Sequence, residues 1–289
     1  MNRLASKFRW FVMAIFFVFF TFGVHIFGLK VPSKFALPIF SCPINYETSY
    51  GGSCFTLCHL KKWVSATTTA DIVFFIVFTF ITILILGRLL CGYICPVGFI
   101  QDVLDKFRQF LKFDQIKFSE KRYKILNIMK WATIIIFFAG GIFWEFSFCS
   151  ICPILAISPP LAGIKIVFSL SIVFAILFIV LSFFKRRFWC NICPIGYMIG
   201  VFHKLSFTSL KKDCQACTEC GACYEACPMG IKIILTEREK DDVTTNDCLM
   251  CMECINKCPE KDALSLAYFE KKIYKASRKN FFENQDINE

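Results

Sequence analysis

Apolar residues in this chain are gathered into long blocks. Four of these blocks approach the roughly 20 apolar residues that a membrane-spanning helix needs. They cover about residues 10–29, 70–90, 128–148 and 164–184, and all are rich in Phe, Ile, Val and Leu. One such block could be a buried core helix, whereas four blocks with basic flanks predict four transmembrane helices. The first block is long for a secretory signal peptide and lacks its small-residue cleavage site, so we expect an uncleaved anchor.

Composition and charge agree with a membrane protein and give its orientation. Hydrophobic residues make up 56% of the chain, and the formal net charge is +11. Lys and Arg favour the cytoplasmic side of a membrane. They cluster before the first block, between the second and third, and after the fourth, whereas Glu145–Ile164 has none. We therefore expect a membrane domain over residues 1–205 of a multi-pass protein of the bacterial inner membrane, with both termini cytoplasmic. The basic excess then reflects topology and not nucleic-acid binding.

The C-terminal third replaces the apolar blocks with cysteines at short, regular intervals. Two consecutive runs have the form Cys-x2-Cys-x2-Cys-x3-Cys-Pro, the bacterial signature of a 4Fe–4S cluster pair. In such pairs three cysteines of one run bind one cluster, and the fourth cysteine, before proline, binds the other. The two predicted ligand sets are Cys217, Cys220, Cys223 and Cys258 for the first cluster, and Cys248, Cys251, Cys254 and Cys227 for the second.

Zinc and disulfides are weaker interpretations of these eight cysteines. Structural zinc prefers two separated cysteine pairs with a longer spacer, and disulfides need an oxidising compartment. Residues 206–269 are therefore expected to form a ferredoxin domain, followed by a charged, disordered tail over 270–289. Alternation at Ile231, Ile233 and Leu235, and apolar residues at 263–266, predict short strands. The expected fold is mainly α: a four-helix transmembrane bundle with a C-terminal α+β ferredoxin domain that carries two 4Fe–4S clusters.

A second cysteine motif occurs twice in the predicted membrane domain. Arg88-x2-Cys91-x3-Cys95-Pro96 recurs as Arg187-x2-Cys190-x2-Cys193-Pro194, which indicates two pseudo-repeats over about 8–100 and 125–200. Further cysteines recur at the opposite ends of the blocks. The inner set is Cys91, Cys95, Cys190 and Cys193, and the outer set is Cys54, Cys58, Cys149 and Cys152.

Each set has more than one interpretation. Either could hold an additional iron–sulfur cluster. The inner cysteines could instead dock a partner or exchange electrons as dithiols, and the outer ones could form disulfides, because that compartment is oxidising. Cys42 and Cys214 stay unassigned, although Cys214 could be an alternative ligand one Cys-x2-Cys step before the first run.

These motifs together resemble a known family over residues 8–269. Four apolar blocks, the two Arg-Cys-Cys-Pro motifs, Ile142-Phe-Trp-Glu145 and the ferredoxin runs are similar to the NapH-type membrane ferredoxin of periplasmic nitrate reductase systems. The MauN-like proteins and the iron–sulfur half of the nitrous oxide reductase regulator share this order of elements. The resemblance implies a quinol dehydrogenase component. It would take electrons from menaquinol or ubiquinol and pass them to a periplasmic ferredoxin or multihaem cytochrome c, and onward to a terminal reductase such as nitrate reductase.

Quinol oxidation also needs a proton acceptor. Ionisable residues at membrane depth are functional candidates, and Glu145 and His25 lie near the outer ends of their blocks. They are the candidate quinol site, with helix-end residues that merely reach water as the alternative. Besides the quinol dehydrogenase subunit, two functions fit the chain: a maturation or reactivation factor that delivers electrons to a periplasmic metalloenzyme, and a redox sensor. The sequence leaves the direction of electron flow open.

Overall fold

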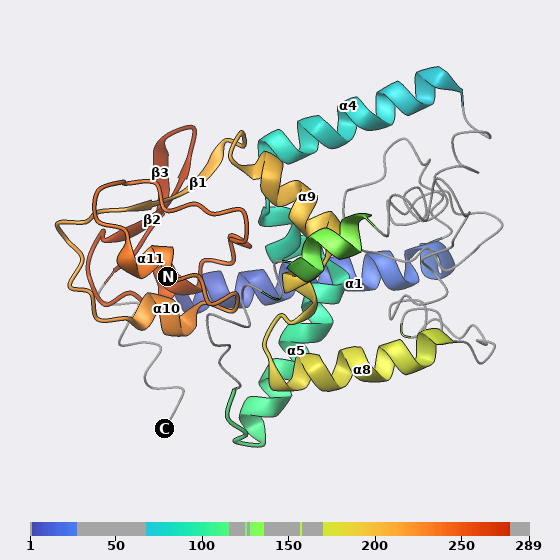
Figure 1. Ribbon diagram of the computed structural model, residues 1–289, viewed down its shortest axis with the longest axis horizontal. Helices are drawn as coiled ribbons and strands as arrows, with labels where there is room; N and C mark the ends of the chain where they lie inside the picture. The colour runs from blue at the N-terminus through green and yellow to red at the C-terminus, as the bar shows by residue number, and fades with distance from the viewer. Residues whose placement is uncertain are drawn as a thin grey trace.

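Four helices of 15 or more residues and a small sheet form the main elements of the described structure. The computed structural model describes residues 2–27, 68–115, 125, 128–135, 157 and 170–277. The helices are α1 (Asn2–Phe27), α4 (Thr69–Leu86), α5 (Pro96–Phe110) and α8 (Leu170–Phe184). In Figure 1, α1 leads away from the cysteine-rich part at the left, and α4 and α8 lead back toward it.

The helical prediction is confirmed, and the four-span bundle stays a prediction. Within the described ranges, Thr69–Leu86 is the helix that is long and apolar enough to cross a membrane, and Ile172–Phe184 is a shorter apolar helix. Residues 128–135, at the start of the third predicted span, are also helical. The rest of that span lies outside the described residues.

Each of the two Arg-Cys-Cys-Pro motifs folds into a short helical turn followed by an α-helix. In the first repeat α4 ends at Gly87 with φ of 52°, a π-helical turn covers Leu90–Ile94, and α5 (Pro96–Phe110) follows. The second repeat has a 3-10 turn and then α9 (Pro194–His203). Proline suits the first helical position because its missing N–H is not needed there. The wider π-helical turn takes up the extra residue between the first pair of cysteines.

Helix α5 buries its polar face. Gln101, Asp102 and Asp105 are buried, whereas Phe107 and Phe110 on the other face are exposed. This is the reverse of a helix packed on the core of a soluble protein. The exposed side chains are those expected of a helix that lies along a membrane surface.

The ferredoxin part has a three-stranded antiparallel sheet in the order β1-β2-β3. The strands are β1 (Thr208–Lys212), β2 (Leu264–Tyr268) and β3 (Lys271–Lys275), and the helices are α10 (Ala222–Ala226), α11 (Ile233–Thr236) and α12 (Glu253–Asn256). The strand expected after the second cysteine run is therefore present as β2. The domain extends beyond the expected boundary, because β3 lies within the segment that we expected to be a disordered tail.

The strand expected around residues 231–235 is wrong, because this segment contains α11. Ile231 and Ile234 are 8% and 2% exposed, and Ile233 is 47% exposed. Burial therefore follows positions i and i+3, as in a helix, and not alternate positions. The short apolar stretch fits both periods, and packing over the cysteine sites selects the helical one.

Four polar contacts tie the helix ends to the ferredoxin part. Arg9 on α1 pairs with Glu253 at 2.8 Å, and Lys130 pairs with Asp247 at 2.6 Å. The two remaining contacts are Arg88 Nη1 to the Asn246 carbonyl at 2.5 Å and Arg186 to Glu253 at 3.5 Å. The ferredoxin part is thus packed on the ends of the helices.

Candidate iron–sulfur sites

The structure brings the cysteines of the ferredoxin segment together in two crossed groups. Cys217, Cys220, Cys223 and Cys258 line one pocket. Cys227, Cys248, Cys251 and Cys254 line another. In both pockets the fourth cysteine comes from the other run, which is the exchange that the spacing predicts.

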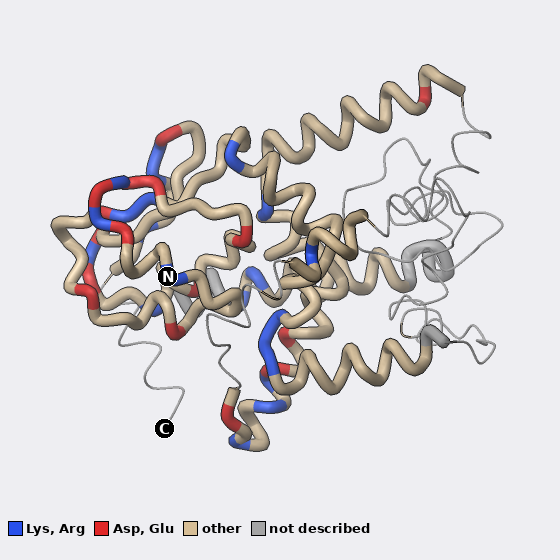
Figure 2. The backbone as a smooth tube through the Cα atoms, in the orientation of Figure 1, with Lys and Arg blue, Asp and Glu red and all other residues tan. Residues whose placement is uncertain are grey.

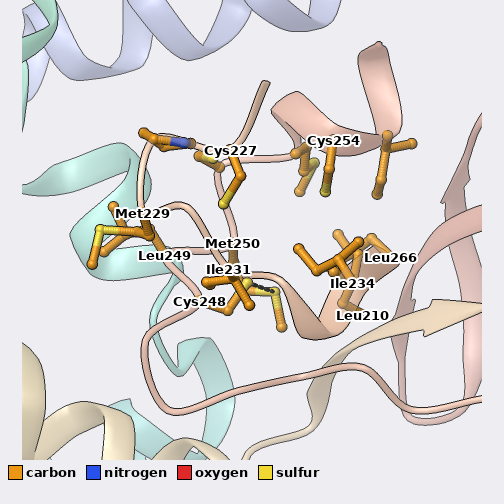
Figure 3. Close-up of a pocket in the computed structure, with 14 residues that line it drawn as sticks. Leu210, Cys227, Met229, Ile231, Ile234, Cys248, Leu249, Met250, Cys254 and Leu266 are labelled. Carbon is orange, nitrogen blue, oxygen red and sulfur yellow. Dashed lines mark hydrogen bonds between the residues drawn. The ribbon is translucent and has the colours of Figure 1, made fainter. Parts of the chain in front are cut away.

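The second pocket is lined by apolar side chains as well as by sulfur. Figure 3 shows Met229, Ile231, Leu249 and Leu266 around the labelled cysteines. Such a lining keeps water from a metal centre and lowers the local dielectric. The wall supplies thiols and apolar contacts, which suits an iron–sulfur cluster.

Left-handed residues shape both cysteine loops. Each two-residue spacer between the first three cysteines of a run contains one residue with positive φ. These are Glu219 at 58°, Gly221 at 82°, Met250 at 51° and Met252 at 61°. For a residue other than glycine this conformation costs roughly 1–2 kcal/mol. The repeated cost indicates that the loops are shaped to direct successive thiols inward.

The electrostatics of the two pockets favour metal-bound thiolates over free thiolates. Burial, together with the neighbouring Cys251 and Cys227, raises the pKa of Cys248 to about 12. Burial likewise raises the pKa of Cys258 to about 11. These thiols therefore stay protonated at neutral pH until a metal replaces the proton. The described cysteines are all free of disulfides.

The inner cysteines also converge, although they come from different repeats. Burial raises the pKa of Cys95 to about 12, and Cys91 and Cys190 add to the effect. Burial raises the pKa of Cys193 as well, with contributions from the other three inner thiols. The four side chains therefore form one electrostatic group. In the part of the chain that the structure describes, no three His, Cys, Asp or Glu side chains could share a single metal ion. A 4Fe–4S cube instead takes four thiolate ligands around four irons.

A buried charge network surrounds the inner cysteines, and sequence reasoning missed it. Arg187 donates to the Asp102 carboxylate from Nε at 2.8 Å and from Nη2 at 2.6 Å. Arg9 Nη2 donates to the same carboxylate at 2.5 Å. Burial alone would raise the pKa of Asp102, but the Arg187 and Arg9 guanidinium groups lower it to about 2. The signal in the sequence is the helical spacing of the polar residues Gln101, Asp102 and Asp105 directly after the first motif.

The remaining predicted residues are outside what the structure describes. This holds for Glu145 and for the outer set, Cys54, Cys58, Cys149 and Cys152, together with Cys42. His25 belongs to α1, but its side chain is not described. Cys214 lies apart from both groups, with its Sγ 3.9 Å from the Glu237 carbonyl.

Comparison with protein families agrees with this arrangement. Residues 68–114 and 166–212 both match a family model described as a 4Fe-4S binding domain, and residues 209–259 match a 4Fe-4S dicluster domain. The two matches to the first model contain the two inner cysteine motifs, which confirms the internal repeat. The chain therefore carries iron–sulfur binding domains on both sides of residue 210.

Several curated proteins are similar over much of the chain. The uncharacterized protein MJ0750 of Methanocaldococcus jannaschii is 31% identical over 225 residues, which cover 75% of this chain and 89% of that protein. Ferredoxin-type protein NapH of Escherichia coli is 27% identical over 60% of both chains. Methylamine utilization ferredoxin-type protein MauN of Methylorubrum extorquens is 30% identical over 49% of this chain and 47% of its own. No solved structure matches. The chain belongs to the family of NapH- and MauN-like ferredoxin-type electron-transfer proteins.

Proposed function

We propose that this protein is a membrane-integral subunit of a quinol dehydrogenase. It takes electrons from menaquinol or ubiquinol and passes them to a periplasmic ferredoxin or multihaem cytochrome c, which supplies a terminal reductase such as nitrate reductase. Its ferredoxin segment carries two 4Fe–4S clusters. The observation that carries the proposal is the crossed grouping of the eight ferredoxin cysteines into two four-thiol pockets.

Residues of the chain would hold these two centres and influence which charge state each of them favours. When bound, each cluster accepts and releases one electron. Lys212 beside the first pocket is buried and donates to the carbonyls of Leu235 and Glu237 at 3.0 and 2.6 Å. Beside the second pocket, the Arg9 guanidinium counteracts the effect of burial on the pKa of Cys251. Such buried cations favour the negatively charged state of a thiolate–iron centre.

The surfaces of the long helices support a place in the inner membrane. Side chains such as Ile76 and Phe80 on α4, and Ile176 and Leu177 on α8, are exposed. Figure 2 shows few charges along α4 and α8, and many charges around the turns after them and the ferredoxin part. A bilayer would cover the apolar length and leave the charged end in water. We propose multi-pass insertion with both termini in the cytoplasm.

Quinol oxidation releases two electrons and two protons, so the protein must separate them. The two cysteine groups would hold the one-electron acceptors that this separation needs. Glu145 and His25 remain our proposed proton acceptors, because ionisable groups at membrane depth are rare without a function. The outer cysteines lie in the same predicted layer and are proposed as a route for electrons toward the periplasm.

The test is reduction of the anaerobically purified full chain by a menaquinol analogue, followed by the visible absorbance of its clusters. We expect partial bleaching by the quinol and complete bleaching by dithionite. Glu145→Gln should slow quinol bleaching at least tenfold and leave dithionite bleaching unchanged, and Cys214→Ser is the matched control. Bleaching by dithionite without any bleaching by quinol would contradict the dehydrogenase role. It would favour a maturation factor that takes electrons from a cytoplasmic donor.

A further inference from the structure

We propose that Cys91, Cys95, Cys190 and Cys193 bind one further iron–sulfur cluster at the seam between the two repeats. The inference rests on the proposed electron-transfer function. Its ligands, however, lie outside the ferredoxin segment and come equally from both halves of the predicted membrane domain. The cluster is thus a centre that neither repeat can form alone.

The second cysteine of each motif caps a helix. Cys193 precedes Pro194 at the start of α9, and its Sγ accepts a hydrogen bond from the Gly196 N–H at 3.4 Å. Cys95 precedes Pro96 at the start of α5 and takes the same N-cap position, without a side-chain capping hydrogen bond. A helix N-terminus stabilises negative charge on a thiolate. Two helix starts are thus directed at one group of sulfurs.

Each repeat's arginine lies against the other repeat's glycine. A Cβ atom on Gly98 would lie 2.2 Å from Arg187 Nη1, and one on Gly196 would lie 3.1 Å from Arg88 Nη2. A side chain at the first of these positions would force the Arg187 guanidinium to shift. The reciprocal contact explains why arginine and glycine occur together in both motifs.

Only one of the two arginines at this site has a carboxylate partner among the described residues. Arg187 is paired with Asp102, but Gly200 takes the equivalent place in the second repeat. Arg88 is 1% exposed, and its Nε has no hydrogen-bond partner. Among the described residues, no carboxylate pairs with Arg88. A buried cation needs a compensating negative charge, and four thiolates around an iron–sulfur core supply it.

The proposed centre is next to the second ferredoxin site. Cys91 and Cys190 pack against the core that contains Cys248 and Cys254. The backbones also meet closely, since a Cβ on Gly92 would lie 2.5 Å from the Leu249 carbonyl oxygen. One electron can pass between the two centres: the ferredoxin cluster is oxidised by one electron as the inner cluster is reduced by one. No proton or covalent change is needed.

The test is iron and acid-labile sulfide per chain, with EPR spectra, on the anaerobically reconstituted full chain. Two cubes alone give about eight irons, whereas a further two-iron or four-iron cluster gives about ten or about twelve. We expect one of the higher values in the wild type. The double variant Cys95→Ser/Cys193→Ser should return to about eight and lose one EPR component, and Cys214→Ser should change neither quantity.

Two results would overturn the inference: about eight irons in the wild type, or an unchanged iron content in the double variant. Should that variant fail to fold, Arg88→Gln tests the same site without removing a ligand. It should lower the midpoint potential of the additional EPR component and leave the two cube signals in place. An unchanged potential would also count against the inference. Absence of the two cube signals from the wild type would instead refute the proposed function.

Discussion

At the scale of single residues, buried charges contribute more than exposed charges to the positions of the elements in this protein. Arg187 and Asp102 are both almost inaccessible to solvent, and their pairing is bidentate. A buried ion pair of this kind contributes little net stability, but removal of one partner typically costs about 3–5 kcal/mol. The pairing therefore fixes the position of α5 and the second motif relative to each other. That position in turn brings Cys91 and Cys190 together.

His203 gives a prediction for pH dependence. Its Nδ1 lies 2.7 Å from Ser206 Oγ and accepts a 3.4 Å hydrogen bond from the Arg88 backbone N–H. Burial, and after it the positive charge of Arg88, lower the pKa of His203 to about 4, while Asp242 acts in the opposite direction. The unfolded chain has a histidine pKa of about 6.5 and thus binds more protons than the folded chain between these values. Stability from the neutral ring is complete above about pH 6.5 and is lost as the pH falls toward 4.

We therefore expect His203→Gln to reduce the acid sensitivity of the protein. Over the range where the two states differ in protonation, this single group contributes up to about 1.4 kcal/mol per pH unit. The measurement is the thermal unfolding midpoint of wild type and variant at about pH 7.5 and about pH 5.5. Acid effects on other groups are common to both proteins. The relevant quantity is therefore how much more the unfolding midpoint of the wild type falls between the two pH values than that of the variant. Equal decreases would mean that His203 is not kept neutral by its surroundings.

At the scale of elements, two glycines let the ferredoxin part approach the helices. A Cβ on Gly200 of α9 would lie 2.2 Å from the Asn246 carbonyl oxygen, and Gly92 faces the Leu249 carbonyl in the same way. Both carbonyl groups belong to the loop around Cys248. Since a backbone carbonyl cannot rotate away like a flexible side chain, a larger residue must displace the loop.

Gly200→Ala should accordingly loosen the ferredoxin part. Overpacking of this kind typically costs about 1–3 kcal/mol, so we expect a lower thermal midpoint and faster proteolytic cleavage in the ferredoxin segment. Val201→Ala is the matched control, because Val201 is the exposed neighbour on the same helix. If both variants resist proteolysis equally, the close contact between α9 and the loop is not important for docking.

Sequence reasoning succeeded in predicting which ferredoxin cysteines lie together. The fourth cysteine of each ferredoxin run lies in the pocket of the other run, because the interval between ligands fixes the crossing. It failed where packing decides between two periods, as at Ile233, and it missed β1 and β3, which are too short and too polar to stand out. Asp102 could not be placed beside Arg187 from the sequence. That contact depends on how two helices meet, which local patterns do not encode.

At the scale of the whole molecule, the contacts with the ferredoxin part alternate along the chain. They involve Arg9 at the start of the first apolar block, Arg88 at the end of the second, Lys130 at the start of the third and Arg186 after the fourth. Start, end, start and end on one side is the pattern that four membrane crossings require. Arg9 and Arg186 also belong to the basic clusters that favour the cytoplasmic side. Topology and the buried network thus use the same arginines.

This arrangement predicts where fusion partners will be active. Green fluorescent protein joined after Glu289 should fluoresce, and alkaline phosphatase at the same point should be inactive, because we propose a cytoplasmic C-terminus. Phosphatase inserted after Tyr50, between the first and second blocks, should be active, because one proposed crossing separates it from the N-terminus. Arg9 pairs with Glu253 in the ferredoxin part, so the start of α1 and the ferredoxin part must share a compartment whatever the number of crossings between them. Active phosphatase at Glu289 would therefore place both in the periplasm and reverse the orientation, whereas inactive phosphatase at Tyr50 would remove the first crossing.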